Sequence, residues 1–131
     1  MQQENKRCFA GFEDRASLYK LWKEAFSDKA EYLDLLFHTG YLSDKDIHVI
    51  MAGEELASAV AVKRVLFGTR KSAEYLCYAA TFRKFQGHGF MRALIKNITG
   101  TDGIYTLIPS NKSLFTYYKS LGFLPELRFY R

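Results

Sequence analysis

The chain has 131 residues, of which 48% are hydrophobic and 25% are charged, with a formal net charge of +5 at pH 7. This length fits a single domain over residues 1–131, and the composition is that of a folded protein, which excludes a disordered chain. Because no apolar run approaches the roughly 20 residues that cross a bilayer, and the polar opening lacks a signal region, we expect a cytoplasmic protein without a membrane contact.

Two helices are predicted in the first third of the chain. Apolar residues recur every three to four positions over residues 15–27, directly after the cap-like Asp14, which predicts an amphipathic helix. A second stripe over residues 29–39 ends at Gly40, a residue that tolerates the left-handed conformation at a helix end. We expect the apolar stripe of each helix to pack against a sheet.

Three strands are predicted next, over residues 48–51, 56–67 and 73–81, with turns at 52–54 and 68–69. We expect them to form a meander. The second strand is apolar at odd and even positions in its first half, which predicts that both of its faces are covered and that helices lie on both sides of the sheet.

The rest of the chain alternates helices and strands. A helical stripe runs from Met91 to Ile98, a strand is predicted over residues 104–108, and a helix ends at Gly122 before a short strand over residues 128–130. The order predicts an α/β fold, with a parallel crossover between the strands near residues 78 and 106.

The turn between Thr81 and the helix from about Gly89, in TFRKFQGHGFMRALI, carries two glycines. Free N–H groups at a helix start, aligned with the helix dipole, bind anions, and the dipole contributes up to about 2 kcal/mol. The P-loop motif is absent, and the dinucleotide fingerprint lacks its third glycine and its acidic residue. A tight turn without a ligand remains the alternative.

Three segments resemble the GNAT N-acetyltransferases. Gln86-Gly87-His88-Gly89-Phe90-Met91 is similar to the coenzyme A signature Q/R-x-x-G-x-G/A, with Met91 in place of the last small residue. IPSNKSLFTYYKSLGF, residues 108–123, resembles the Asn, Tyr and Leu-Gly-Phe pattern of the helix that closes the coenzyme site. LWKEAFSDKAEYLDLLF, residues 21–37, resembles the opening helices of the bacterial branch with enhanced-intracellular-survival-type domains.

This resemblance implies a mixed central sheet with helices on both faces and acetyl-CoA as cosubstrate. Residues 78–81 would pair with the pantetheine arm, and the amides of residues 86–91 would hold the diphosphate, with Arg83, Lys84 and His88 as outer contacts. Asn111 matches the asparagine at the start of the family's helix, and the alternative is an ordinary N-cap. The implied coenzyme-binding residues are Ala79, Ala80, Thr81, Gln86, Gly87, His88, Gly89, Phe90, Met91 and Asn111.

Transfer of an acetyl group to an amine requires two proton transfers. A lysine-like amine with a pKa of about 10.4 is protonated at pH 7, and freeing its lone pair costs about 4.6 kcal/mol, so a base is useful. Glu74 lies near the position of the catalytic glutamate in some family members; the alternative is a surface glutamate on a strand. Tyr118 matches the general-acid tyrosine that protonates the leaving thiolate, and the alternative is a core tyrosine.

Other residues are expected to be structural. Cys8 and Cys77 are too few for a disulfide framework and show no metal spacing, so we expect reduced thiols and no metal. His38 and His48 have no partner within a motif and are taken as structural or surface residues. The basic residues are spread along the chain, which argues against a nucleic-acid binder.

The resemblance also leads to expectations about the sheet edge, the partners and the function. Only residues 124–131 follow the Leu-Gly-Phe helix, so the C-terminal strands are shortened, and either a second copy completes the sheet edge as a homodimer or the unit is minimal or truncated. The expected function is acetyl transfer from acetyl-CoA to a primary amine of a small molecule or peptide. The alternative is a coenzyme A binding or sensor module without turnover.

Overall fold

The computed structural model describes residues 6–26, 30–67, 71–100, 103–107 and 112–123. Five strands form one sheet in the order β1-β2-β3-β4-β5, in which β1 to β4 are antiparallel to their neighbours and β5 runs parallel to β4. The strands are β1 (Lys6–Ala10), β2 (Ile47–Ala52), β3 (Glu55–Phe67), β4 (Lys71–Thr81) and β5 (Tyr105–Leu107). The predicted mixed α/β sheet and the parallel crossover are confirmed.

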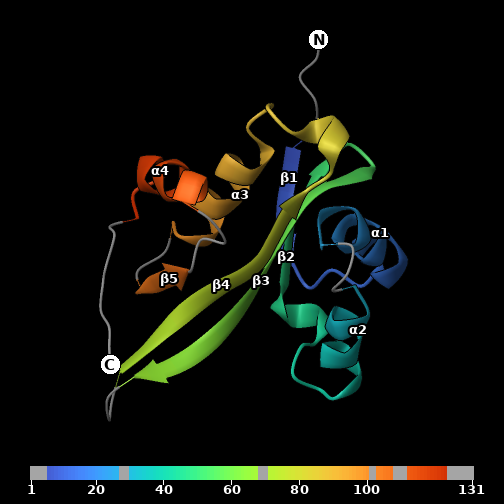
Figure 1. Cartoon of the computed structure of the whole chain (residues 1–131), viewed down its shortest axis with the longest axis horizontal. Helices are drawn as coiled ribbons and strands as arrows, with labels where there is room; N and C mark the ends of the chain where they lie inside the picture. The colour runs from blue at the N-terminus through green and yellow to red at the C-terminus, as the bar shows by residue number, and fades with distance from the viewer. Residues whose placement is uncertain (1–5, 27–29, 68–70, 101–102, 108–111, 124–131) are drawn as a thin grey trace.

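Helices cover both faces of this sheet (Figure 1). α1 (Arg15–Phe26) and α2 (Ala30–His38) lie on one face, and α3 (Phe90–Ile98) lies on the other with α4 (Lys112–Ser120) beside it. Asp14 caps α1 as predicted, since its carboxylate accepts hydrogen bonds from the Ser17 amide at 3.1 Å and the Ser17 hydroxyl at 2.7 Å. Two 3-10 turns, η2 (Asp44–Asp46) and η3 (Arg83–Phe85), precede β2 and follow β4.

β3 runs through the centre of the molecule and packs on both sides. Every residue from Leu56 to Val62 is buried. Ala59 and Ala61 contact the core under α1 and α2, whereas Val60 and Val62 contact the core under α3. The continuous apolar run therefore indicates two covered faces, as predicted.

β1 is an edge strand that the sequence analysis did not predict. It pairs with β2 from Lys6 opposite Ala52 to Ala10 opposite His48. Its five residues include two lysine or arginine side chains and remain partly exposed, so its apolar signal is limited to Cys8 and Phe9, which pack into opposite cores. The predicted turn at 68–69 and the predicted strand at 128–130 lie outside the described residues.

None of the helices among the described residues combines the length and apolar character that crossing a membrane requires.

We predict that the packing of α3 carries much of the stability. Leu94 is fully buried in the core between α3 and the sheet, so Leu94→Ala should lower the free energy of unfolding by about 2 to 5 kcal/mol. Lys96→Ala on the exposed side of the same helix should stay within about 0.5 kcal/mol of the parent. Urea unfolding measures both, and similar losses in the two variants would contradict the packing described here.

Candidate functional site

The glycine turn leaves a row of backbone amides without partners at the start of α3. Gly87 and Gly89 both have a φ of +82°, a conformation that glycine adopts without steric cost. Residues 86–89 are exposed, and no described carbonyl accepts a hydrogen bond from the amides of residues 87–92. Such amides at a helix N-terminus are donors for an anion.

The turn is held in place from several sides. Phe90 is buried and meets Phe85 edge to face, with ring centroids 5.3 Å apart. The Gln86 side chain donates to the Thr81 carbonyl at 3.3 Å, which folds the turn back onto the end of β4. Thr81 in turn shares a hydrogen bond of 2.7 Å between its hydroxyl and that of buried Ser58. The free amides are therefore presented by a fixed loop.

The basic side chains near the turn differ in what they contact. Lys84 pairs with Glu55 at 3.1 Å, so its charge is partly neutralised. The Arg83 amide donates to the Glu24 carboxylate at 2.5 Å, and the Arg83 side chain is exposed. Arg92 donates to the Ser120 hydroxyl at 3.3 Å and so joins α3 to α4. His88 is exposed in the turn itself.

Among the described residues, β4 and β5 pair over three residues. The pairs are Glu74 with Tyr105, Tyr75 with Thr106 and Leu76 with Leu107. β4 continues to Thr81, and residues 77–81 have no partner on β5 among the described residues. This unpaired edge is about 16 Å long at roughly 3.3 Å per residue, and Phe82 and η3 connect it to the turn.

A β-bulge sits in the middle of this unpaired edge. Ala61 lies opposite Cys77 and Ala59 lies opposite Ala80, so Tyr78 and Ala79 together face the single residue Val60. Tyr78 has a φ of +53°, the only positive φ at a non-glycine residue in the described chain. Such a conformation costs about 1 to 3 kcal/mol and concentrates at functional sites.

The bulge turns Tyr78 toward α1. Its ring lies 6.0 Å from that of Trp22 and 6.5 Å from that of Phe26, and burial raises the pKa of Tyr78 to about 12. The indole N–H of Trp22 is buried with no hydrogen-bond partner among the described residues. The sequence analysis included Tyr78 in the pairing segment but did not predict the bulge, for which a single sequence carries no signal.

Tyr118 packs against the core on the α3 side of the sheet. It is half-buried on α4 and belongs to the same core as Leu76 and Leu107, the last paired residues of the two strands. Its ring meets those of Tyr117 and Phe123 at 5.2 Å and 6.2 Å. Burial, and then the neighbouring Tyr117, raise the pKa of Tyr118, so the phenol keeps its proton at neutral pH. Asn111 lies outside the described residues.

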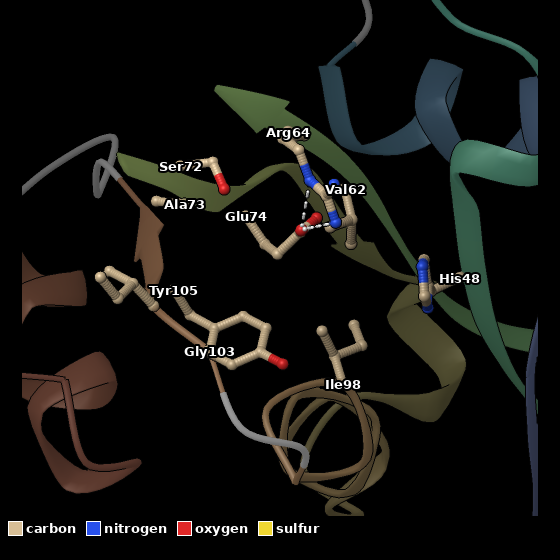
Figure 2. Close-up of a pocket in the computed structure, with 10 residues that line it drawn as sticks. His48, Val62, Arg64, Ser72, Ala73, Glu74, Ile98, Gly103 and Tyr105 are labelled. Carbon is tan, nitrogen blue, oxygen red and sulfur yellow. Dashed lines mark hydrogen bonds and ion pairs between the residues drawn. The ribbon is translucent and has the colours of Figure 1, made fainter. Parts of the chain in front are cut away.

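Glu74 lines a pocket on the α3 side of the sheet, at the stretch where β4 and β5 pair. The pocket has a volume of about 370 Å³, and the Glu74 carboxylate in it is paired with Arg64, whose Nε and Nη2 lie 3.1 Å and 3.0 Å from Oε2. Figure 2 shows the two side chains directed toward one another. Glu74 is four residues before the bulge, about 13 Å along the strand.

His48 also lines this pocket and is half-buried. Burial lowers the pKa of His48, and nearby Glu74 and Asp46 only partly oppose this effect, so His48 is neutral at pH 7. Within the described part of the chain no group of three or more His, Cys, Asp or Glu side chains could hold a metal ion. Cys8 and Cys77 are both free thiols.

Comparison with protein-family models and with curated proteins gives no match, whereas solved structures match well. A possible acetyltransferase from Clostridium difficile 630 has a TM-score of 0.73 at 16% identity, over 98% of this chain and 97% of its own. Glucosamine-6-phosphate N-acetyltransferase from Arabidopsis thaliana has a TM-score of 0.66 at 16% identity, over 98% of this chain and 97% of its own. The N-acetyltransferase YlbP from Bacillus subtilis, in complex with coenzyme A, has a TM-score of 0.65 at 16% identity, over 90% of this chain and 84% of its own.

These structures confirm the predicted fold, which is that of the GNAT N-acetyltransferases. At this level of identity the likeness concerns the fold alone. The resemblance to the enhanced-intracellular-survival branch, the bacterial origin and the role of each site residue stay predictions.

We predict that Cys77 is unreactive although it lies on the edge of β4 that has no β5 partner among the described residues. Its thiol donates to the Ala61 carbonyl at 3.5 Å, and burial raises its pKa to about 12, so only about one thiol in 10⁴ is ionised at pH 8. Iodoacetamide at pH 8 should label Cys77 at least about 100-fold more slowly in the folded than in the denatured protein, as followed by peptide mass spectrometry. Rapid labelling of the folded protein would instead identify Cys77 as a usable nucleophile.

Proposed function

We propose that this protein is an acetyl-CoA-dependent N-acetyltransferase that moves the acetyl group directly to a primary amine in a ternary complex. The observation that carries the proposal is the continuity of two unsatisfied backbone surfaces. The edge of β4 over residues 77–81 has no β5 partner among the described residues, and η3 connects it to the free amides of residues 87–92. A ligand that fits both needs an anionic end and an extended arm with amide groups, which coenzyme A has.

The coenzyme would be held mainly by backbone. Its diphosphate accepts hydrogen bonds from the turn amides and is favoured by the α3 dipole. Its pantetheine amides pair with residues 79–81 as an added strand would. The exposed side chains of Arg83 and His88 lie beside the turn and add positive charge, and Asn111 is proposed to contact the coenzyme from the start of α4.

The bulge would bind the thioester carbonyl. Tyr78 and Ala79 share one partner residue on β3, so the ladder leaves N–H capacity there for a ligand oxygen. A donor fixed in this way stabilises the negative charge that develops on the carbonyl oxygen as the amine attacks. The strain at Tyr78 is then part of the mechanism, because it holds the donor in place before the substrate arrives.

Tyr118 would protonate the leaving group. When the amine nitrogen has bonded to the carbonyl carbon, the carbon–sulfur bond breaks and the sulfur leaves as a thiolate. A phenol that keeps its proton at neutral pH can donate it to that thiolate. Tyr118 packs against the same core as Leu76 and Leu107, and the arm of the coenzyme would end at this core.

Glu74 would take the proton from the attacking amine. Because it lies about 13 Å along the strand from the bulge, the proton would reach it through water or through an amine that extends into its pocket. The other possibility is that Glu74 serves only the ion pair with Arg64. A high pKa makes Cys77 a poor nucleophile, which favours direct transfer over an acetyl-cysteine intermediate.

The cellular location, the acceptor and the oligomeric state are also proposals. We propose a cytoplasmic enzyme acting on a small-molecule or peptide amine, without nucleic acid. In the described residues no strand pairs with the outer side of β5, and a second copy that completes this edge would make a homodimer. The alternative function is a coenzyme A binding or sensor module that keeps the turn but lacks turnover.

We predict that acetyl-CoA binding depends on the shape of the turn. Gly89→Ala places a side chain at a φ of +82°, and the distorted turn should weaken acetyl-CoA binding at least about tenfold in a calorimetric titration. Gly53→Ala is the matched control, since Gly53 has a φ of +63° in the turn between β2 and β3. Both variants should lose similar stability, and equal affinity in both would contradict binding at the turn.

We predict that turnover depends on the two proposed proton-transfer groups. Tyr118→Phe and Glu74→Gln should each lower kcat for acetyl transfer about 100-fold or more while acetyl-CoA still binds. Thiol release over a panel of amines measures this. Arg64→Gln is the control for Glu74, because it breaks the same ion pair but keeps the carboxylate.

The outcomes separate the alternatives. If Glu74→Gln and Arg64→Gln have the same modest effect, Glu74 has a structural role only. If neither Tyr118→Phe nor Glu74→Gln changes turnover while acetyl-CoA binds, the role assignments are wrong. If acetyl-CoA binds but no amine is acetylated by the parent protein, the protein is a binding module.

A further inference from the structure

One helix, α1, contacts both the bulge of β4 and the connector η3 that follows this strand. It reaches the bulge through Trp22 and Phe26, whose ring centroids lie 6.0 Å and 6.5 Å from that of Tyr78. Between these two residues in the sequence, Glu24 reaches η3, where its carboxylate accepts a hydrogen bond of 2.5 Å from the Arg83 amide. The same helix therefore contacts the middle of residues 77–81 and the backbone just after them.

The Arg83 amide needs an acceptor from outside η3. Arg83 is the first residue of this turn, and the first amides of a helical turn have no acceptor within it. The next amides are used inside the connector, because Phe85 donates to the Phe82 carbonyl at 2.8 Å. Gln86 donates to the Arg83 carbonyl at 3.2 Å. Glu24 supplies the missing acceptor, and a hydrogen bond to a carboxylate is roughly twice as strong as one between neutral groups.

η3 is held from both faces of the sheet. Phe85 packs against the core on the α3 side, whereas the Arg83 amide is bound from α1, which lies on the other face (Figure 1). The Phe82 amide donates to the Ala57 carbonyl at 3.0 Å. Because the contacts of Phe82 and Phe85 do not involve Glu24, we expect loss of the Glu24 contact to loosen residue 83 without unfolding the turn.

The charge of Glu24 has the wrong sign for a residue that would attract an anion. A carboxylate beside the turn repels a diphosphate, so removal of this charge by itself favours binding of the coenzyme. Glu24 contacts the backbone of Arg83, whose side chain is exposed. A benefit of Glu24 for coenzyme binding can therefore come only from the geometry that its hydrogen bond imposes.

We propose that Glu24 is a positioning residue for the coenzyme. By binding the Arg83 amide, it fixes the connector between residues 77–81 and the free amides of residues 87–92. Both surfaces are then held at the separation that one extended ligand needs before that ligand arrives, which lowers the cost of binding. This inference rests on the proposed function. Glu24 itself contacts neither the coenzyme nor the acceptor and acts through η3.

Two neutral substitutions separate the hydrogen bond from the charge. Glu24→Gln keeps an oxygen that can accept from the Arg83 amide, whereas Glu24→Ala removes it, and both variants lack the negative charge. In a calorimetric titration of the full chain with acetyl-CoA, Glu24→Ala should bind at least about fivefold more weakly than Glu24→Gln. Glu24→Gln should bind within about twofold of the parent or more tightly, because it loses a repulsive charge.

Glu31 provides the matched pair of control variants. It is an exposed carboxylate in the first turn of α2, so Glu31→Gln and Glu31→Ala make the same chemical changes on the neighbouring helix. These two variants should bind acetyl-CoA within about twofold of each other, as is usual for surface substitutions. Urea unfolding checks that all four variants are folded.

Amide hydrogen exchange tests the contact in the absence of coenzyme. In the free protein, the Arg83 amide should exchange at least about fivefold faster in Glu24→Ala than in Glu24→Gln. The amides of Phe85 and Gln86, which donate within η3, should follow in the same direction. The amide of Leu94, in the buried part of α3, should exchange equally in both variants.

The outcomes distinguish this inference from the function on which it rests. If acetyl-CoA binds the parent but binds the two Glu24 variants equally, the positioning role is overturned and the proposed function stands, even where exchange at Arg83 differs. A difference within the Glu31 pair as large as that within the Glu24 pair also overturns the inference. If acetyl-CoA does not bind the parent, the proposed function fails and the positioning role fails with it.

Discussion

The structure depends on an interruption in backbone pairing along one strand. β4 is hydrogen-bonded to β3 along most of its length, whereas among the described residues its other edge pairs with β5 only from Glu74 to Leu76. Backbone N–H and C=O groups are obligatory hydrogen-bonding groups, and leaving them unpaired in a buried place is costly. The edge of residues 77–81 that has no β5 partner among the described residues is therefore suited to a ligand that pairs as a strand does.

The packing of α3 fixes where the free amides lie. α3 must cross from the end of β4 to the start of β5, and the apolar face of α3, from Phe90 to Ile98, fixes it against β2 and β3. This leaves the row of free amides at the N-terminus of α3 connected to the free strand edge by η3. The bulge at Tyr78 lies within that edge and reverses which face the following residues occupy, which turns Tyr78 toward Trp22 and away from α3.

Much of this arrangement could be predicted from local sequence patterns, whereas the rest depends on pairing between residues that are far apart in the sequence. The helices α1 to α3 and the central strands were predictable because each has a strong apolar period, and the two glycines mark the turn. β1 was missed because a five-residue edge strand that begins with two charged residues has almost no such pattern. The bulge could not be predicted, because it arises from the register between β3 and β4 and not from any residue type.

The partner of Glu74 was only partly within reach of the sequence. The register places Arg64 opposite Glu74, whereas a two-residue loop at the predicted turn, 68–69, would place Arg64 opposite Ala73. The role of Tyr118 depends on its packing against the same core as Leu76 and Leu107, an arrangement that depends on the parallel crossover.

A single strand sets the spacing of the proposed chemistry. β4 carries Glu74 and, four residues later, the bulge, so the separation between proton acceptor and carbonyl site follows from the rise of an extended chain, and η3 connects the end of β4 to the turn. Because successive residues point to opposite faces, Glu74 lies on the α3 side together with Tyr118, while Cys77 lies on the α1 side and is held by Ala61. The one nucleophilic side chain among residues 74–81 that could compete with an amine is thereby turned away from both proposed proton-transfer groups, and this favours direct transfer in the geometry of the fold itself.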